Sequence, residues 1–455
     1  MFEICLNVTF FSYRQAAPAK ADASHGILRS IIQTKPARPA GDGIMKILIA
    51  GHGAKEHALA MAMDRHGDCE LMVIPGNPGT VEIEHDQESS AADIDHTLSL
   101  EDAAKAFEPD LILSIDEKVC KSDKLDNLRA KGYRVLAPSQ KAARALINTP
   151  EWMQNLRERN IRTADFEIVN TYSDAYNILQ TTDAPWIIRS YGEKSLFGIV
   201  YSLDEGMDLL DAIFMTRVDK ILITEFLEGP RFNLSVLIYN NQIVTMDPVR
   251  IVRGMYEQED DPQRKGMGAW SPVEGIDENV VKECVEGFLI PVLEDLRDKD
   301  HEFNGFINAE FILEEDGPTL VNLKPGLPEI GSCVLFPRLD CEMEETIERL
   351  MSGKKIRIPF KPTSCTALSM AAEDFPERKS FGAPINFDED MEGTVYHHHT
   401  RVEDGQLETN GGRILVVCAT GQNFKQSAKN AVDACTHVKC DDLFYRTDIN
   451  PDMQN

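Results

Sequence analysis

From residue 45 onward, short apolar runs alternate with stretches in which apolar residues recur at helical spacing. The first run, Ile47–Ala50, enters the turn Gly51-His52-Gly53, and a helical pattern follows near Glu56–Asp64. Further apolar runs lie at Leu71–Ile74, Leu111–Ser114 and Tyr133–Leu136. Short apolar strands separated by helices predict a parallel sheet covered on both faces, and this unit closes near Pro138.

The rest of the chain mixes strands with helices and glycine-rich turns. Strands are predicted at Trp186–Arg189, Ile221–Glu225, Asn233–Tyr239, Gly305–Leu313 and Thr319–Leu323. Helices are predicted at Glu151–Arg159, Val280–Leu296 and Ser427–Cys435. The turn Glu315-Asp316-Gly317 favours a hairpin between the last two strands. The whole pattern is that of an α/β protein.

The net charge of −28 limits the partners of this chain. A phosphate backbone or an anionic membrane attracts clusters of Lys and Arg, so neither nucleic acid nor membrane is an expected partner. No apolar run reaches the roughly 18 to 20 residues that span a bilayer. The ten cysteines form no C-x-x-C pair, which favours free thiols in a reducing cytoplasm.

Residues 1–44 differ from the rest in being basic and poor in periodicity. Such a composition is typical of an organelle transit peptide. A disordered extension or a mis-called start is the favoured alternative, because Met45 stands directly before the first core strand. We exclude this segment from the fold prediction.

The turn after the first strand is a candidate phosphate site. Gly51 and Gly53 would let a phosphate approach the backbone N–H groups at the start of a helix. A nicotinamide-binding fold would also need an acid after the second strand, and the sequence there is P-G-N-P-G-T. Its residues Asn77, Gly79 and Thr80 form a second polar turn at the end of a strand, beside the first. The pair predicts a site for a phosphorylated sugar or similar anion, and a plain tight turn is the alternative.

Four motifs resemble those of phosphoribosylamine-glycine ligases, also called glycinamide ribonucleotide synthetases, of the ATP-grasp superfamily. The family's G-N-G-G-R-E-H-A-L stands here as Gly51 to Leu59, and its P-G-N-x-G-T is intact as Pro75 to Thr80. Its G-G-M-G-A-x-S-P matches Lys265 to Pro272 except at Lys265 itself. Its T-N-G-G-R is intact as Thr409 to Arg413.

The resemblance implies three parts. These are an N-terminal parallel-sheet pre-ATP-grasp domain at 45–148, a two-part ATP-grasp domain at 149–354 and a small C-terminal α+β domain at 355–455. It implies a cytoplasmic enzyme of purine biosynthesis that uses ATP and Mg²⁺ to phosphorylate the carboxylate of glycine, after which phosphoribosylamine attacks the acyl phosphate. The chain would be a monomer or a small homo-oligomer.

The resemblance also suggests further substrate-binding residues. Glu56 and His57 belong to the family's opening motif, although helix capping and charge compensation explain them equally well. Arg413 is a candidate anion ligand, with an exposed hairpin turn as the alternative. In the stretch Tyr396 to Thr400, only His397 and His399 share a strand face, and a structural role is favoured for both.

The ATP-binding residues of the family are partly replaced. Arg189 ends the strand where the family has a lysine, and a guanidinium still pairs with phosphate. In the glycine-rich loop that includes Gly192 and Gly198, Tyr191 replaces an acid and Phe197 replaces a second lysine. A positive charge for phosphate is therefore lost.

The hinge that binds adenine is also altered. Its paired glutamates become Thr224 and Glu225, so one acid survives. The following G-E-E becomes Gly229, Pro230 and Arg231, and of a later basic segment only Arg253 remains charged.

The metal site departs most from the family pattern. The family holds Mg²⁺ through a Glu and an Asn, and these positions are Asn322 and Lys324 here. A divalent ion needs oxygen ligands and is repelled by an ammonium group. Glu310 stands where other ATP-grasp enzymes have a metal-binding glutamate, so Glu310 and Asn322 are the candidate ligands of one ion while Lys324 contacts phosphate directly. An outward-facing Glu310, with Lys324 paired to a nearby acid, is the alternative.

Two classes of function remain open. The first is an ATP-dependent ligase acting on glycine and phosphoribosylamine, or on altered substrates, with weakened nucleotide and metal sites. The second is a non-catalytic paralogue that binds a sugar phosphate or a nucleotide. The changes at Phe197, Asn322 and Lys324 predict slow or absent turnover, because neutralising phosphate charge supplies most of the catalysis in phosphoryl transfer. No catalytic residue is assigned.

Overall fold

The computed structural model describes residues 3–5, 44–65, 69–86, 95–192, 195–254, 266–373 and 375–449. Within them the predicted α/β fold is confirmed, with one parallel sheet in the N-terminal part and mainly antiparallel sheets beyond it. Of the N-terminal segment 1–44, residues 3–5 form strand β1, and residues 6–43 lie outside the described residues. Lys265 also lies outside them.

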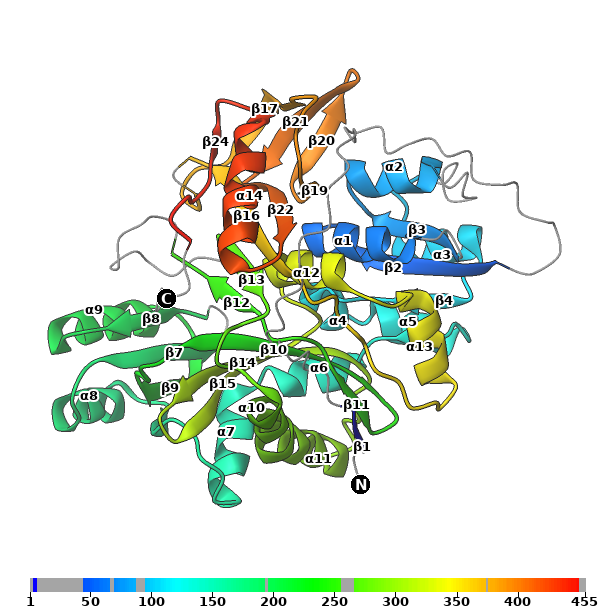
Figure 1. Ribbon diagram of the computed structural model, residues 1–455. Helices are drawn as coiled ribbons and strands as arrows, with labels where there is room; N and C mark the ends of the chain where they lie inside the picture. Colours follow the sequence, from blue (N-terminus) through cyan, green and yellow to red (C-terminus); the bar gives the residue numbers. More distant parts are fainter. Residues whose placement is uncertain are drawn as a thin grey trace, which may run out of the picture.

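The N-terminal part is a parallel sheet with the strand order β3-β2-β4-β5 (Figure 1). Its strands are β2 (Met45–Gly51), β3 (Cys69–Pro75), β4 (Leu111–Leu113) and β5 (Val135–Leu136). Its helices are α1 (Ala54–Met63), α2 (Pro78–Asp86), α3 (Leu100–Phe107), α4 (Glu117–Cys120), α5 (Lys124–Ala130) and α6 (Gln140–Leu146). Side chains of β2 alternate between two cores, since Ile47 and Ile49 pack with α1 while Leu48 packs with α3 and α5. Both faces of the sheet are therefore buried.

The central part contains two sheets, both antiparallel except for one parallel edge strand, β1, in the larger sheet. The smaller has the order β6-β9-β7-β8, with β6 (Phe166–Val169), β7 (Trp186–Gly192), β8 (Phe197–Val200), β9 (Val218–Glu225) and helices α8 (Tyr172–Thr181) and α9 (Leu203–Phe214). The larger has the order β1-β11-β10-β14-β15, with β1 (Glu3–Cys5), β10 (Arg231–Tyr239), β11 (Gln242–Thr245), β14 (Gly305–Glu314) and β15 (Gly317–Pro325). Helix α7 (Thr149–Glu158) and the segments α10 (Glu278–Glu283), η1 (Cys284–Leu289) and α11 (Ile290–Asp298) pack against it. The predicted hairpin β14–β15 is confirmed.

The C-terminal sheet takes strands from two parts of the chain. Strand β13 (Gly268–Ser271) pairs with β12 (Arg250–Val252) on one side and with β16 (Ser364–Ala372) on the other, and β22 (Arg413–Gly421) and β19 (Thr394–His397) follow in that order. Smaller strands are β17 (Ser380–Pro384), β18 (Asn386–Phe387), β20 (Thr400–Glu403), β21 (Gln406–Gly411), β23 (Val438–Lys439) and β24 (Leu443–Phe444), and helix α14 (Phe424–Thr436) covers one face. The ATP-grasp and C-terminal regions predicted from the sequence thus share one sheet.

Helix α12 (Glu329–Leu335) lies where the three parts meet (Figure 1). Its residues Ile330, Val334 and Leu335 join a core cluster that includes residues of α1, β10 and β16. Segment η2 (Phe336–Arg338) and helix α13 (Met343–Met351) follow it. Because one short buried helix contacts all three parts, α12 fixes their relative positions.

One predicted helix differs in form. The pattern over Val280–Leu296 predicts a single α-helix, whereas the structure contains a π-helical turn, η1, between α10 and α11. Pro291 has no N–H to donate to the carbonyl of Gly287, so a regular α-helical bond is missing there. The π turn stands directly before this interruption.

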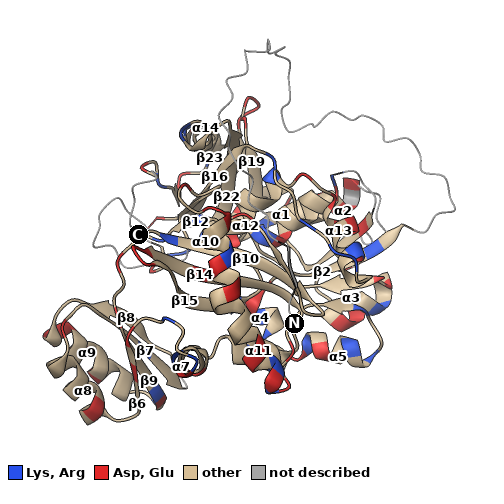
Figure 2. Cartoon of the chain, turned by 60° about the horizontal axis from the view of Figure 1, so that its bottom comes forward, with Lys and Arg blue, Asp and Glu red and all other residues tan. Residues whose placement is uncertain are grey.

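Acidic residues are spread over the outer helices, where they mix with Lys and Arg on α3 and α5 (Figure 2). No helix among the described residues is long and apolar enough to cross a membrane.

A buried ion pair joins the central and C-terminal parts. Arg338 is fully buried, and its guanidinium donates to Asp247 Oδ2 at 2.8 Å, to Ser271 Oγ at 2.6 Å and to the Thr363 carbonyl at 2.5 Å. Removing the cation would leave the Asp247 carboxylate buried without its partner.

We expect Arg338→Ala to lower the free energy of unfolding by about 3 to 5 kcal/mol. The matched control is Arg349→Ala, whose side chain is half exposed and is expected to change stability by less than about 0.5 kcal/mol. Urea unfolding followed by circular dichroism measures both variants. Equal midpoints for the two variants would contradict the assigned role of Arg338.

Candidate functional site

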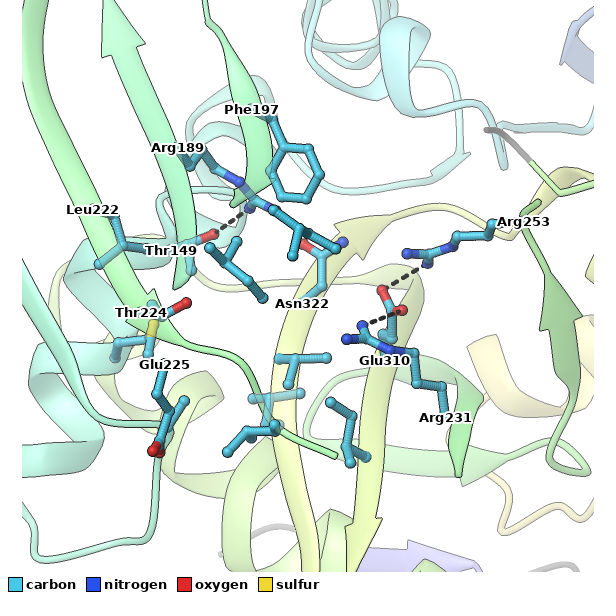
Figure 3. Close-up of a pocket in the computed structure, with 18 residues that line it drawn as sticks. Thr149, Arg189, Phe197, Leu222, Thr224, Glu225, Arg231, Arg253, Glu310 and Asn322 are labelled. Carbon is cyan, nitrogen blue, oxygen red and sulfur yellow. Dashed lines mark hydrogen bonds and ion pairs between the residues drawn. The ribbon is translucent and has the colours of Figure 1, made fainter. Parts of the chain in front are cut away.

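A cleft lies between the smaller sheet of the central part and the β10-β14-β15 face of the larger one (Figure 3). Its empty volume is about 710 Å³, which includes space open to solvent. Its lining includes Thr149, Met153, Ile187, Arg189, Phe197, Ile199, Leu222, Glu225, Arg231, Arg253, Glu310, Ile312, Leu320 and Asn322.

Apolar side chains supply most of one region of the cleft. Ile187 and Leu222 come from the smaller sheet, and Ile312 and Leu320 come from the larger one. Apolar walls of this kind suit an aromatic base. Glu225, the surviving acid of the predicted hinge, accepts a hydrogen bond from the Asp165 N–H at 2.7 Å, so its carboxylate already holds the neighbouring strand end.

Arg189 extends into the cleft from β7. One of its nitrogens lies 3.5 Å from Thr149 Oγ1, and its guanidinium lies 5.2 Å from the ring centroid of Phe197 on the neighbouring strand. Phe197 is 46% exposed, so an exposed aromatic side chain lies beside the cation. A cation and an aromatic face together favour an anionic ligand with a flat ring system.

Glu310 is held by two arginines in the same cleft. Its Oε2 lies 2.7 Å from Nη2 of Arg253, and its Oε1 lies 3.6 Å from Nη1 of Arg231 (Figure 3). Glu310 is only 4% exposed. The alternative of a carboxylate that faces solvent therefore does not describe this side chain. Although burial raises the pKa of Glu310, Arg253 and Arg231 outweigh that effect and lower its pKa to about 2.

The strand register explains how Arg231 reaches Glu310. Asn233 of β10 pairs with Glu310 of β14, so Arg231, two residues before Asn233, projects from the same face of the sheet. Such diagonal neighbours are within reach of long side chains. Arg253 approaches from another sheet, directly after β12.

The residues around Glu310 do not fit a divalent metal ion. The carboxylate oxygens already contact two guanidinium groups, and Asn322, its neighbour across the β14–β15 ladder, adds only a neutral amide. Lys324 is exposed on β15, and its charge also lowers the pKa of Glu310. An ion here would be surrounded by positive charge, which hard cations do not tolerate.

The remaining residues predicted for ATP lie elsewhere. Gly192 ends β7 against the backbone of Arg217 and Val218, and a side chain at Gly198 would meet Leu209. Neither glycine lines the cleft. Arg189, Glu225, Glu310 and Asn322 do line it.

The residues predicted for the sugar phosphate gather at a second place, around the start of α1. A Cβ atom at Gly51 would lie 2.5 Å from Cγ of Glu56, and one at Gly53 would lie 2.4 Å from Oε1 of Glu329. The Gly53 N–H donates to Glu56 Oε2 at 2.8 Å, and the Lys55 N–H donates to Glu329 Oε1 at 3.0 Å. Two carboxylates of the chain thus occupy the turn where the sequence predicts a phosphate.

The second polar turn, which follows β3, is also closely packed. Asn77 donates through Nδ2 to the carbonyls of His52 and His397, each at 3.0 Å. A Cβ atom at Gly79 would lie 2.0 Å from the ring of His57, and His57 Nδ1 accepts from the His397 N–H at 3.0 Å. Thr80 Oγ1 accepts from the Asn77 N–H at 2.9 Å. These residues join the N-terminal part to β19 of the C-terminal sheet.

Arg413 and His398 complete the cluster from the C-terminal side. Arg413 is buried, so the alternative of an exposed arginine on a hairpin turn does not describe it. Its Nη2 lies 3.4 Å from His398 Nε2. That same histidine nitrogen lies 3.7 Å from Glu329 Oε1. Although burial raises the pKa of Glu329, the charges of His398, Lys55 and Arg413 hold it well below its ordinary value.

Sequence reasoning missed three residues of these sites: Arg231 as a partner of Glu310, and both Glu329 and His398 at the start of α1. Arg231 could have been found from the register of two adjacent strands. Glu329 and His398 lie hundreds of positions from α1 along the chain, and no local pattern links them to it.

Two antiparallel subdomains that enclose a cleft with an apolar region and a cationic region define the chain as an ATP-grasp protein. Family models support this assignment over most of the chain from residue 45. The N domain, the ATP-grasp (A) domain and the C domain of phosphoribosylglycinamide synthetase match residues 45–145, 149–326 and 365–451. The chain belongs to the phosphoribosylamine–glycine ligase family of ATP-grasp carboxylate–amine ligases, which act in purine biosynthesis and use ATP and Mg²⁺.

Individual relatives are distant but cover nearly the whole chain. Phosphoribosylamine–glycine ligase of Halalkalibacterium halodurans is 26% identical over 417 residues, covering 89% of this chain and 96% of that protein. The same enzyme of Caldanaerobacter subterraneus is 25% identical, covering 89% and 99%. The crystal structure of phosphoribosylamine–glycine ligase from Thermotoga maritima superposes with a TM-score of 0.75 at 22% identity, covering 89% of this chain and 100% of that one.

The carboxylate of Glu56 gives the cluster at α1 a characteristic pH dependence. Burial raises the pKa of Glu56 to about 8, even though Lys55 lowers it, while Glu329 and Asp116 raise it further. Because the folded state binds this proton more tightly than the unfolded state, the contribution to stability is complete below pH 4.5. It falls as the pH rises towards 8.

We expect Glu56→Gln to become more stable relative to the parent protein as the pH rises from 5 to 8, because glutamine does not titrate. Urea midpoints at pH 5, 6, 7 and 8 measure this difference. Glu228→Gln is the same substitution at an exposed position and should show a constant difference. A constant difference for Glu56→Gln as well would show that the side chain is ionised at neutral pH.

Proposed function

We propose that this chain is a slow ATP-dependent ligase that joins glycine to phosphoribosylamine. The observation that carries the proposal is the cleft, in which apolar walls lie beside Arg189, Arg231 and Arg253. The apolar walls suit the adenine base, and the guanidinium groups suit the phosphates. The match to all three family domains supports the choice of glycine and phosphoribosylamine as substrates.

The proposed reaction has two steps. A carboxylate oxygen of glycine attacks the γ-phosphorus of ATP, and the bond to the β-phosphate oxygen breaks to release ADP. The amine of phosphoribosylamine then attacks the acyl carbon, inorganic phosphate leaves, and the amine loses a proton. The arginines of the cleft neutralise charge on the transferred phosphoryl group, which is the main source of catalysis in such a reaction.

Turnover is slow because Glu310 takes up part of that positive charge. Two of the three arginines that line the cleft contact its carboxylate, and a negative group at this place also repels the phosphates. Phe197 adds no charge where the resemblance to the family predicts a lysine.

We expect phosphoribosylglycinamide to form from ATP, glycine and phosphoribosylamine at a rate lower than that of a bacterial relative by about a hundredfold or more. Mass spectrometry of the product and a coupled assay for ADP release measure the two parts of this claim. Rapid ADP release stimulated by both substrates would contradict the proposed low turnover rate. Absence of the amide product after prolonged incubation would contradict the proposed ligase activity.

A non-catalytic paralogue that binds a sugar phosphate is the second candidate. It rests on the motifs Gly51 to Leu59 and Pro75 to Thr80, which are retained although Glu56 and Glu329 occupy the turn before α1. Thermal shifts with ribose 5-phosphate, and separately with ATP and Mg²⁺, distinguish the two. Stabilisation by the sugar phosphate alone supports the paralogue, stabilisation by ATP supports the ligase, and stabilisation by neither contradicts both.

A further inference from the structure

Glu310 has the surroundings of a bound anion rather than those of a metal ligand. Of the two carboxylates that line the cleft in the described part of the chain, Glu225 is held by the Asp165 N–H, and Glu310 alone contacts arginines. Both oxygens of Glu310 face a guanidinium, from Arg253 at 2.7 Å and from Arg231 at 3.6 Å. Phosphate oxygens accept the same charge-assisted hydrogen bonds from arginine.

The two arginines are well placed to bind such a ligand. The side chain of Arg231 is 15% exposed and that of Arg253 is 27% exposed, so both are partly shielded from water yet open to the cleft. Electrostatic attraction is stronger in such partly buried places than in bulk water. With Arg189 on the opposite wall, the described residues of the cleft place three arginines against Glu310 and Glu225, so their summed charge is positive.

We propose that Glu310 is an internal stand-in for the phosphates of a nucleotide. In this arrangement Arg231 and Arg253 bind the polyphosphate directly and in the absence of a divalent cation, and Glu310 competes with it for the same guanidinium groups. The proposal deepens the proposed function, since it rests on nucleotide binding in the same cleft. It accounts for the lack of a metal-compatible donor set among the described residues around Glu310.

Calorimetric titration of the full chain with ADP tests this proposal. Binding is measured in EDTA and again in excess Mg²⁺, for the parent protein and for Glu310→Gln. The matched control is Glu228→Gln, which removes the same charge at an exposed position outside the cleft. Adenosine, which has no phosphate, serves as a second control ligand.

We expect Mg²⁺ to change the Kd of ADP by less than about threefold in the parent protein. Glu310→Gln should tighten ADP binding in EDTA on the order of tenfold, because the arginines lose their internal competitor and the ligand loses a repulsive charge. Adenosine binding should not change between these proteins, and Glu228→Gln should bind ADP like the parent.

Three results would overturn the proposal. These are tenfold or greater strengthening of ADP binding by Mg²⁺, weaker ADP binding by Glu310→Gln, or no ADP binding by any protein in either buffer. If circular dichroism shows that Glu310→Gln does not fold, Arg253→Gln takes its place. We expect Arg253→Gln to bind ADP in EDTA about tenfold more weakly than the parent protein. An unchanged affinity would overturn the proposal.

The outcomes that would contradict the proposed function differ from those that would contradict this inference. A protein that binds ADP without metal but forms no amide product would leave this inference standing and remove the ligase. A protein that forms the product yet binds ADP only with Mg²⁺ would do the reverse.

Discussion

A buried carboxylate must be paired, and in this chain the pairing of Glu310 determines the character of the cleft. An isolated charge at a site that is 4% exposed would be costly, and the two guanidinium groups from Arg231 and Arg253 remove that cost. The β10–β14 register brings Arg231 close, and the end of β12 brings Arg253. The resulting cleft carries its positive charge on protein side chains. Its chemistry towards phosphates then follows from arginine rather than from a metal ion.

A second constraint lies around α12, the short helix between the three parts of the molecule. Its first residue, Glu329, accepts from the backbone at the start of α1 and lies near His398 of the C-terminal part. The close approach explains why position 53 is glycine, because a side chain there would overlap the Glu329 carboxylate. The polar cluster that the sequence marks as a phosphate turn is therefore also the joint that holds the N-terminal and C-terminal parts together.

The fold was largely predictable from the sequence, and the site only in part. Apolar periodicity gave the parallel sheet and the β14–β15 hairpin, because each depends on residues close together in the chain. The π turn before Pro291 was not predicted, since helical periodicity does not register one extra residue in a turn. Glu310 was identified as a cleft residue by its position in a motif. Its arginine partners were not, because Arg253 reaches it only through the meeting of two sheets.

The central claim is that arginines, and not a metal ion, neutralise the phosphates in this cleft. The most direct test is a crystal structure of the full chain with ADP, grown with Mn²⁺ and measured for anomalous scattering. The account predicts phosphate oxygens within hydrogen-bonding distance of Arg231 and Arg253 and no anomalous peak at Glu310. A manganese peak bound to a carboxylate oxygen of Glu310, at the roughly 2.0 to 2.6 Å typical of hard cations, would contradict it.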